Sequence, residues 1–131
     1  MVDALHAAHR ALRTGGTLID LRPNWSTHPP RVRRAGSELG GLRERDAARA
    51  DSAASDRAID RVMREGDFAL IRAGHFWYSQ RFADLARLDA WIATSPGTAG
   101  YDRGTRARLA ARPDRPITLR KALTYAILAR I

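Results

Sequence analysis

Four side chains suited to binding a polar substrate or a partner occur close together, in residues 20–28. Asp20 and Arg22 end an apolar segment, and Trp25 and His28 lie in the loop that follows it. Ligands of open α/β sheets bind beyond the carboxyl ends of strands, so these four residues are the predicted substrate or partner surface. A structural role is the alternative: Trp25 would fill the core, and Asp20 would pair with an arginine.

Histidine spacing raises the question of a metal site. His6 and His9 are three residues apart on a predicted helix, where both rings could in geometry share an ion. No carboxylate at a matching position completes such a site, and the chain has no cysteine to form thiolate sites or disulfides. The sequence therefore predicts no metal site. No Ser/His/Asp set is recognisable either, so no catalytic residue is assigned.

An aromatic cluster occupies residues 75–78, with Arg72 and Arg81 on either side. Interleaved arginines and aromatic rings can stack on nucleic-acid bases. Neighbouring residues of a strand point to opposite faces, however, so the cluster cannot form one platform. We therefore expect Phe76 and Tyr78 to lie in the core and the other two rings to be covered by a helix or a partner.

The first elements that must position these residues are a helix, a tight turn and a strand. Asp3 is a plausible N-cap of the helix, and Gly15 can take the left-handed conformation that ends it. Gly16 allows a sharp reversal, residues 17–21 are mostly β-compatible, and Pro23 closes the strand because it cannot donate to a ladder.

This helix, turn and strand resemble the later part of class I S-adenosylmethionine-dependent methyltransferases. There a helix ends in an Arg-x-Leu-x-Pro-Gly-Gly turn before the fifth strand of the sheet. The residues that match are Arg10, Leu12, Gly15 and Gly16, with Thr14 in place of the proline. The resemblance implies an α/β fold: one truncated, Rossmann-like half-domain over residues 1–131, with a small mixed sheet ending in an antiparallel strand pair.

The family binds its cofactor through a glycine-rich loop after the first strand and an acidic residue at the end of the second. This sequence has no Gly-x-Gly-x-Gly, and no strand is predicted before its first helix. Neither the glycine pair at 15–16 nor that at 40–41 lies between a strand and a helix in that order. We expect no cofactor to be bound by this chain alone; S-adenosylmethionine would require a partner that supplies the missing half.

The remaining elements are predicted as a twisted ribbon within 31–45, a helix over 46–65, a strand over 67–82 and a short helix capped by Asp84. Gly74 predicts a bulge or a close backbone approach in the strand, and residues 94–104 read as a loop. The end of the chain, 116–131, fits a strand by its alternation and a helix by its four-residue spacing. The position of the last strand in the family favours the strand, paired antiparallel with 68–82 and in one sheet with 17–22.

The composition limits the partners. The chain carries 22 arginines, one lysine and a net charge of +9, which attracts polyanions at low salt, but no nucleic-acid motif accompanies it. Binding to nucleic acid should therefore be weak and non-specific. No apolar run approaches the roughly 20 residues of a membrane span and no signal peptide is evident, which predicts a cytoplasmic protein without a membrane partner.

The predicted function is that of a methyltransferase-like binding or assembly module. The strand at 17–22 is apolar on both faces and would have one unpaired edge. A second copy, a cofactor-binding chain or a helix folded over the edge could cover it. The alternative is a subunit of a split methyltransferase, active only with that second chain. A weaker alternative is a non-specific nucleic-acid-binding protein.

Overall fold

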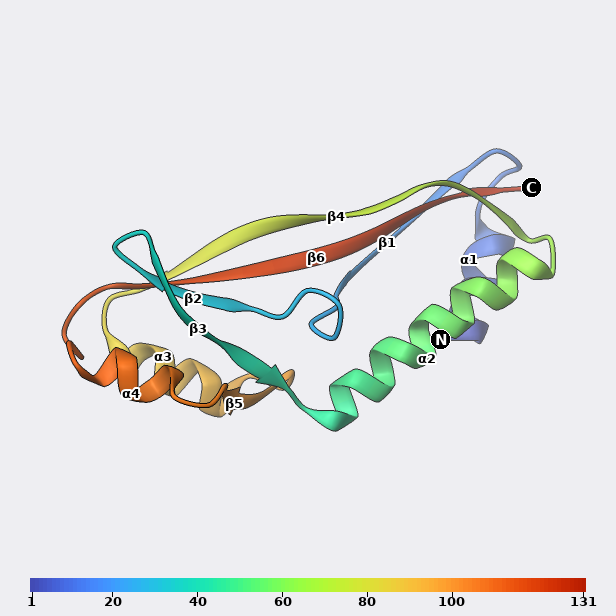
Figure 1. Ribbon diagram of the computed structural model, residues 1–131. Coiled ribbons are helices and arrows are strands. Elements are labelled where there is room, and N and C mark those ends of the chain that lie inside the picture. Colours follow the sequence, from blue (N-terminus) through green and yellow to red (C-terminus); the bar gives the residue numbers. More distant parts are fainter. The chain divides into compact units, whose positions relative to one another are not determined.

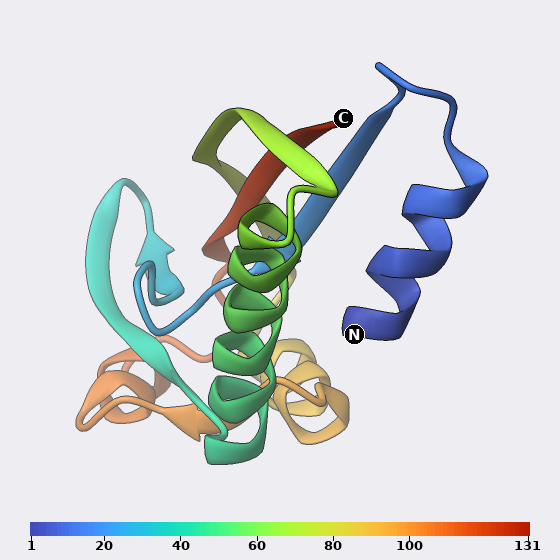
Figure 2. The same cartoon turned by 90° about the vertical axis from the view of Figure 1, so that its right-hand side faces the viewer.

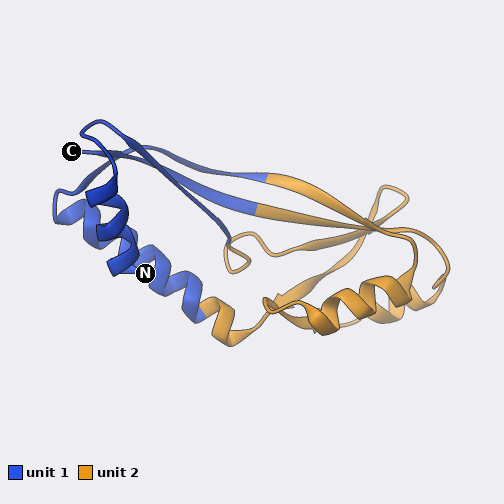
Figure 3. Ribbon diagram, turned by 180° about the vertical axis from the view of Figure 1, so that it is seen from behind, with its two compact units in different colours: residues 1–23, 50–76, 123–131 blue, residues 24–49, 77–122 orange.

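Six strands and four helices make up the α/β fold of this chain, and the computed structural model describes residues 1–131 (Figure 1). The chain divides into two compact units (Figure 3). Unit 1 comprises residues 1–23, 50–76 and 123–131, and unit 2 comprises residues 24–49 and 77–122. Each unit has its own cluster of buried apolar side chains. None of the four helices is both long enough and apolar enough to cross a membrane.

Unit 1 begins with helix α1 (Val2–Ala11), from which the chain reverses into strand β1 (Thr17–Pro23) (Figure 2). Gly15 has a φ of 74°, the left-handed conformation that was predicted for it. It does not end the helix, however, because α1 ends at Ala11 with Leu12 as an extended C-cap. The expected N-cap is wrong: Met1 holds that position, without a side-chain hydrogen bond. Asp3 instead lies inside the first turn, where its negative charge is favourable near the helix N-terminus.

Strand β6 (Ile117–Arg130) joins the sheet of unit 1 through both of its edges. β1 pairs with it antiparallel, from Thr17 opposite Ala129 to Pro23 opposite Leu123. Strand β4 (Phe68–Phe82) also pairs with β6, and the backbone N–H of Ile131 donates to the Asp67 carbonyl at 3.2 Å. The end of β6 thus meets the start of β4, which makes this pair antiparallel as well.

These pairings confirm that segment 117–130 is a strand and that it shares a sheet with 68–82 and 17–22. The expected mixed sheet is not what forms, because every pair of neighbouring strands with a described register is antiparallel. β1 and β4 do run in the same direction, but β6 separates them.

The core of unit 1 lies where α1 and helix α2 (Asp46–Arg64) pack on this sheet. Its buried members include Leu5, Ile59, Val62, Phe68 and Leu128. Three of α2's residues in this cluster, at positions 58, 59 and 62, form one apolar stripe of a helix whose other faces are charged. Gly66, with a φ of 82°, follows the end of α2 in the left-handed conformation typical of a residue just after a helix.

Unit 2 contains a hairpin of strands β2 (Arg31–Arg34) and β3 (Ser37–Glu44), which confirms the ribbon expected there. β2 also pairs with the first part of β6, with Val32 opposite Leu119. The expectation of a plain loop over 94–104 is wrong, because strand β5 (Thr98–Tyr101) pairs antiparallel with β3. This pairing supplies hydrogen-bond partners for the backbone N–H and C=O groups of β5. The proline and glycine residues around this short segment are typical of loops, so the sequence did not predict a strand there.

Helices α3 (Leu85–Thr94) and α4 (Thr105–Ala110) complete unit 2. Asp84 caps α3 as predicted, since its carboxylate accepts from the Arg87 backbone N–H at 2.9 Å. The buried core of this unit draws on both helices and the strands: Val32, Leu42, Phe82, Leu85, Leu88, Leu109, Ile117 and Leu119.

Candidate functional site

Asp20 and Arg22, the first two residues of the predicted surface, contact each other at the end of β1. The Arg22 Nε donates to the Asp20 carboxylate at 2.6 Å, and another guanidinium nitrogen donates to Asp56 of α2 at 2.8 Å. Burial lowers the pKa of Arg22, but the hydrogen bonds to these two carboxylates outweigh it, so the pKa is raised. The pairing of Asp20 with an arginine matches the structural alternative, and it ties β1 to α2.

Trp25 and His28 belong to unit 2. The Trp25 side chain is buried, with 8% of the residue exposed. The His28 ring packs edge-on against Trp77, with the ring centroids 6.0 Å apart. The structure thus brings Asp20 and Arg22 into contact and gives Trp25 and His28 packing roles in the other unit. A substrate surface made of all four residues stays a prediction.

Trp25 also lines a cavity of about 610 Å³ within unit 2. The lining carries charges of both signs, from Arg43, Glu44, Asp46, Arg49 and Asp102. Ser26 lies there too, and its hydroxyl donates to the Glu44 carboxylate at 2.7 Å. An aromatic ring among opposite charges can hold a small polar ligand. No histidine or cysteine lies in this lining.

Lys121, the only lysine of the chain, is buried and is held by a group of side chains that the sequence did not reveal. Its Nζ donates to the Gln80 amide oxygen at 2.6 Å and lies 4.8 Å and 5.0 Å from the ring centroids of Trp91 and Tyr78. Such cation–π contacts stabilise an ammonium group that has left water. The sequence gives one indication of this group: Lys121 lies on the face of the predicted strand that carries the apolar residues.

The aromatic residues of β4 also differ from expectation. Phe76 and Tyr78 are not in the core, because 45% and 38% of these residues are exposed. The Tyr78 ring makes a cation–π contact with the ammonium group of Lys121. Trp77 lies on the opposite face, under the guanidinium of Arg120 at 5.2 Å. The approach at Gly74 is made by a side chain, since a Cβ built there would be 2.9 Å from the Tyr125 hydroxyl.

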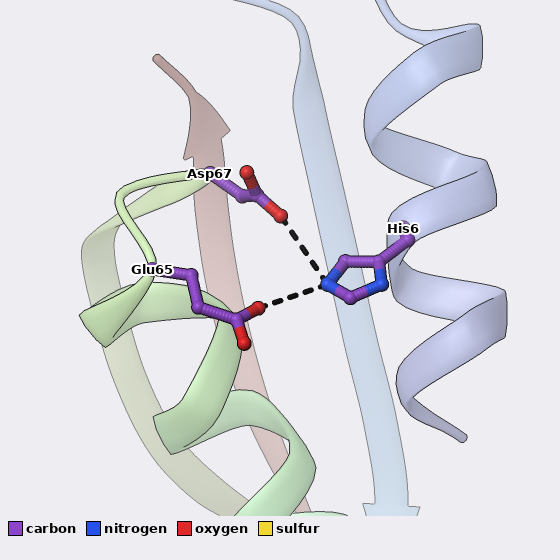
Figure 4. A group of neighbouring side chains, drawn as sticks. All are labelled: His6, Glu65 and Asp67. Carbon is purple, nitrogen blue, oxygen red and sulfur yellow. Dashed lines mark hydrogen bonds and ion pairs between the residues drawn. The ribbon is translucent and has the colours of Figure 1, made fainter.

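His6 lies between two carboxylates that are far from it in the sequence (Figure 4). Its Nε2 is 2.9 Å from an oxygen of Glu65 and 3.5 Å from an oxygen of Asp67. His9 takes no part, because its ring packs edge-on against Phe68. The partners come from the end of α2 and the turn into β4, so only tertiary structure brings them to α1.

A second polar group in unit 2 joins α3, β5 and α4. The Tyr101 hydroxyl donates to Asp89 at 2.7 Å, and Arg106 donates to the other carboxylate oxygen at 2.8 Å. Burial opposes the charge of Asp89, but the hydrogen bonds from Arg106 and Tyr101 prevail and lower its pKa. Burial and the bond to Asp89 raise the pKa of Tyr101. The group links three elements.

Comparison of the chain with protein-family models, with curated proteins and with solved structures gave no match.

Proposed function

We propose that this chain is a methyltransferase-like domain that acts as a binding or assembly module in the cytoplasm, without an S-adenosylmethionine site of its own. Two observations support the relation to the C-terminal half of that family. A helix, a turn with a left-handed Gly15 and a strand occur in the expected order, and β1, β4 and β6 share one sheet. The sequence has no glycine-rich loop of the kind with which that family binds its cofactor, and this supports a chain without a cofactor site of its own.

The observation that carries the assembly role is the open edge of β1. β1 pairs with β6 on one side and with no other strand. Arg130 exchanges backbone hydrogen bonds with Gly15 and Gly16, at 2.9 Å and 2.8 Å. Bonding alternates along an antiparallel ladder, so Ile19 and Leu21 direct their N–H and C=O groups away from β6. These groups form a template for a further strand.

A second copy of this chain is the partner that fits this edge. In a twofold antiparallel pairing centred on Leu21, Asp20 of one copy lies opposite Arg22 of the other, and the reverse holds by symmetry. Opposite charges in such cross-strand pairs are favourable. A pairing centred on Asp20 would set two aspartates against each other, which disfavours that register. The sequence of β1 is thus self-complementary in one register.

Light scattering over a dilution series tests this assembly. We expect a dimer that dissociates on dilution. Leu21→Pro removes an N–H that faces the open edge, without removing a bond to β6, and should give a monomer with an unchanged circular dichroism spectrum. Leu21→Ala keeps that N–H and serves as the matched control, which should still dimerise. A wild-type chain that stays monomeric at high concentration would reject the dimer.

Calorimetric titration with S-adenosylmethionine tests the other half of the proposal. We expect no measurable heat of specific binding, because the chain offers no glycine loop for the cofactor. Micromolar binding by the isolated chain would overturn the proposal and identify a cofactor site elsewhere in the fold.

One observation favours the split methyltransferase as the second candidate. Ile19 and Leu21 of β1 stand opposite Ile127 and Tyr125 of β6, and these two β1 side chains are 64% and 51% exposed. The Tyr125 ring covers Gly74 of β4. Phe76 is two residues further along β4, so its side chain lies on the same face as this contact. A cofactor-binding polypeptide would bury such a face. A monomeric chain that binds a hydrophobic dye, and loses this binding when Ile19 and Leu21 are both changed to Thr, would favour this candidate over the dimer.

A further inference from the structure

Unit 1 brings three groups that can coordinate a metal to one point from three places in the chain. His6 comes from α1, Glu65 from the residue after α2, and Asp67 from the residue before β4 (Figure 4). One donor atom from each lies within 4.8 Å of the other two. All three side chains are about one-third exposed, at 30%, 37% and 27%, so an ion from solvent can reach them.

We propose that His6, Glu65 and Asp67 bind a divalent transition-metal ion, with Zn²⁺ as the best fit, and that this ion fastens α1 to the turn between α2 and β4.

The spacing of the donor atoms supports this assignment. Donors about 2.0–2.2 Å from a zinc ion, at angles between octahedral and tetrahedral values, lie roughly 3.0–3.4 Å from one another. The His6 Nε2 lies 2.9 Å and 3.5 Å from the nearest oxygens of Glu65 and Asp67. The donor oxygens of Glu65 and Asp67 lie within 4.8 Å of each other. Three protein ligands leave a fourth position for water.

The turn that carries both carboxylates is fixed by its backbone. The Gly66 N–H donates to the Met63 carbonyl and the Asp67 N–H donates to the Val62 carbonyl, at 3.2 Å and 3.1 Å. The backbone carbonyl of Asp67 in turn accepts a hydrogen bond from the N–H of Ile131. Left-handed Gly66 therefore sets Glu65 and Asp67 on either side of a rigid reversal, which reduces the entropy lost when both bind one ion.

Arg61 orients the Glu65 carboxylate from outside the cluster. Its Nε donates to one oxygen of Glu65 at 2.7 Å, while the other oxygen faces His6. A metal-binding carboxylate is commonly held by such an outer hydrogen bond. The positive charge of Arg61 also offsets one of the two carboxylates, which predicts weaker binding than two unpaired carboxylates would give.

The ligand set selects the metal. An imidazole nitrogen suits Zn²⁺ and its transition-metal neighbours, whereas Mg²⁺ and Ca²⁺ prefer oxygen ligands alone. The competing explanation is a protonated His6 that only forms ion pairs with the two carboxylates. Such a group would hold α1 in place without any ion.

Isothermal titration of the metal-free chain with zinc chloride separates the two explanations. We expect one Zn²⁺ per chain, a higher melting temperature with zinc, and no comparable effect of MgCl₂. His6→Ala and Asp67→Asn should each weaken zinc binding by roughly tenfold or more and abolish the thermal shift. His75→Ala changes an exposed histidine outside the cluster and should bind zinc as the wild type does.

Two results would overturn the metal site. One is the absence of zinc binding by the wild-type chain, which would leave the ion-pair explanation. The other is equal zinc affinity of the wild type and His6→Ala, which would place the ion on other groups. Circular dichroism of each variant checks that the fold is retained. None of these readouts depends on the oligomeric state, so the test stands apart from the proposed assembly role.

Discussion

Asp89 shows how one side chain can hold several elements together. It accepts a hydrogen bond from Tyr101 at 2.7 Å and pairs with Arg106 at 2.8 Å. The Asp89 side chain is 32% exposed, so solvent partly screens the ion pair. The sequence does not predict this group, because Tyr101 and Arg106 are both distant from Asp89 along the chain.

We expect Asp89→Asn to destabilise the protein by about 1 kcal/mol at neutral pH, since the charge-assisted bonds become neutral or are lost. The lowered pKa of Asp89 means that its contribution is present above the unfolded-state pKa of about 3.9. It is lost as the pH falls through the lower folded-state pKa. Urea unfolding at neutral pH and near pH 3 should therefore show a difference between wild type and variant that shrinks in acid. The matched control is Asp114→Asn, an exposed position, which should have little effect. A difference that does not change with pH would contradict this role of the charge.

The residues of the predicted site show what local sequence can and cannot reveal. Asp20 and Arg22 are two apart on a strand and share a face, so their contact follows from alternation alone. The third member, Asp56, lies on α2, and no sequence rule selects it among the other acidic residues of that helix. The same holds for Glu65 and Asp67 beside His6, which meet only when α1 packs on the rest of unit 1.

At the scale of elements, β6 is the most informative segment. Its apolar residues fit both a two-residue and a four-residue period, so periodicity alone left strand and helix open. Pairing with β1 on one edge and β4 on the other decides for the strand. β5 shows the reverse case: its four residues are too few for a pattern, and only the partner strand β3 defines it.

The alternation of β6 predicts unequal effects at two neighbouring positions. Leu128 is fully buried in the core of unit 1, whereas Ile127 points to the opposite face and is partly exposed. We expect Leu128→Ala to cost about 3 kcal/mol and Ile127→Ala less than about 1 kcal/mol. Urea unfolding of both variants measures this contrast. Equal losses would mean that both faces of β6 are covered in solution, as a partner on the exposed face would require.

At the scale of the whole molecule, the dominant property is positive charge. Ion pairs engage Arg22, Arg31, Arg61 and Arg106, yet the chain keeps a net charge of +9. Arginine suits bidentate contact with phosphate, so contact with polyanions is expected at low salt. Trp77 and Tyr78, neighbours on β4, contact cations on opposite faces, so the aromatic residues 75–78 do not form one platform.

We therefore expect weak, sequence-independent binding to DNA and RNA that falls steeply as salt rises. Each phosphate neutralised by an arginine releases a counterion, which lowers the logarithm of the binding constant by about 0.9 per contact for each tenfold rise in salt. Fluorescence anisotropy with two unrelated duplexes, measured over a salt series, gives this slope and the sequence preference together. The two duplexes should give the same line and lose detectable binding near physiological salt. A preference that survives there would require base contacts, and it would favour a nucleic-acid-binding role over the assembly module.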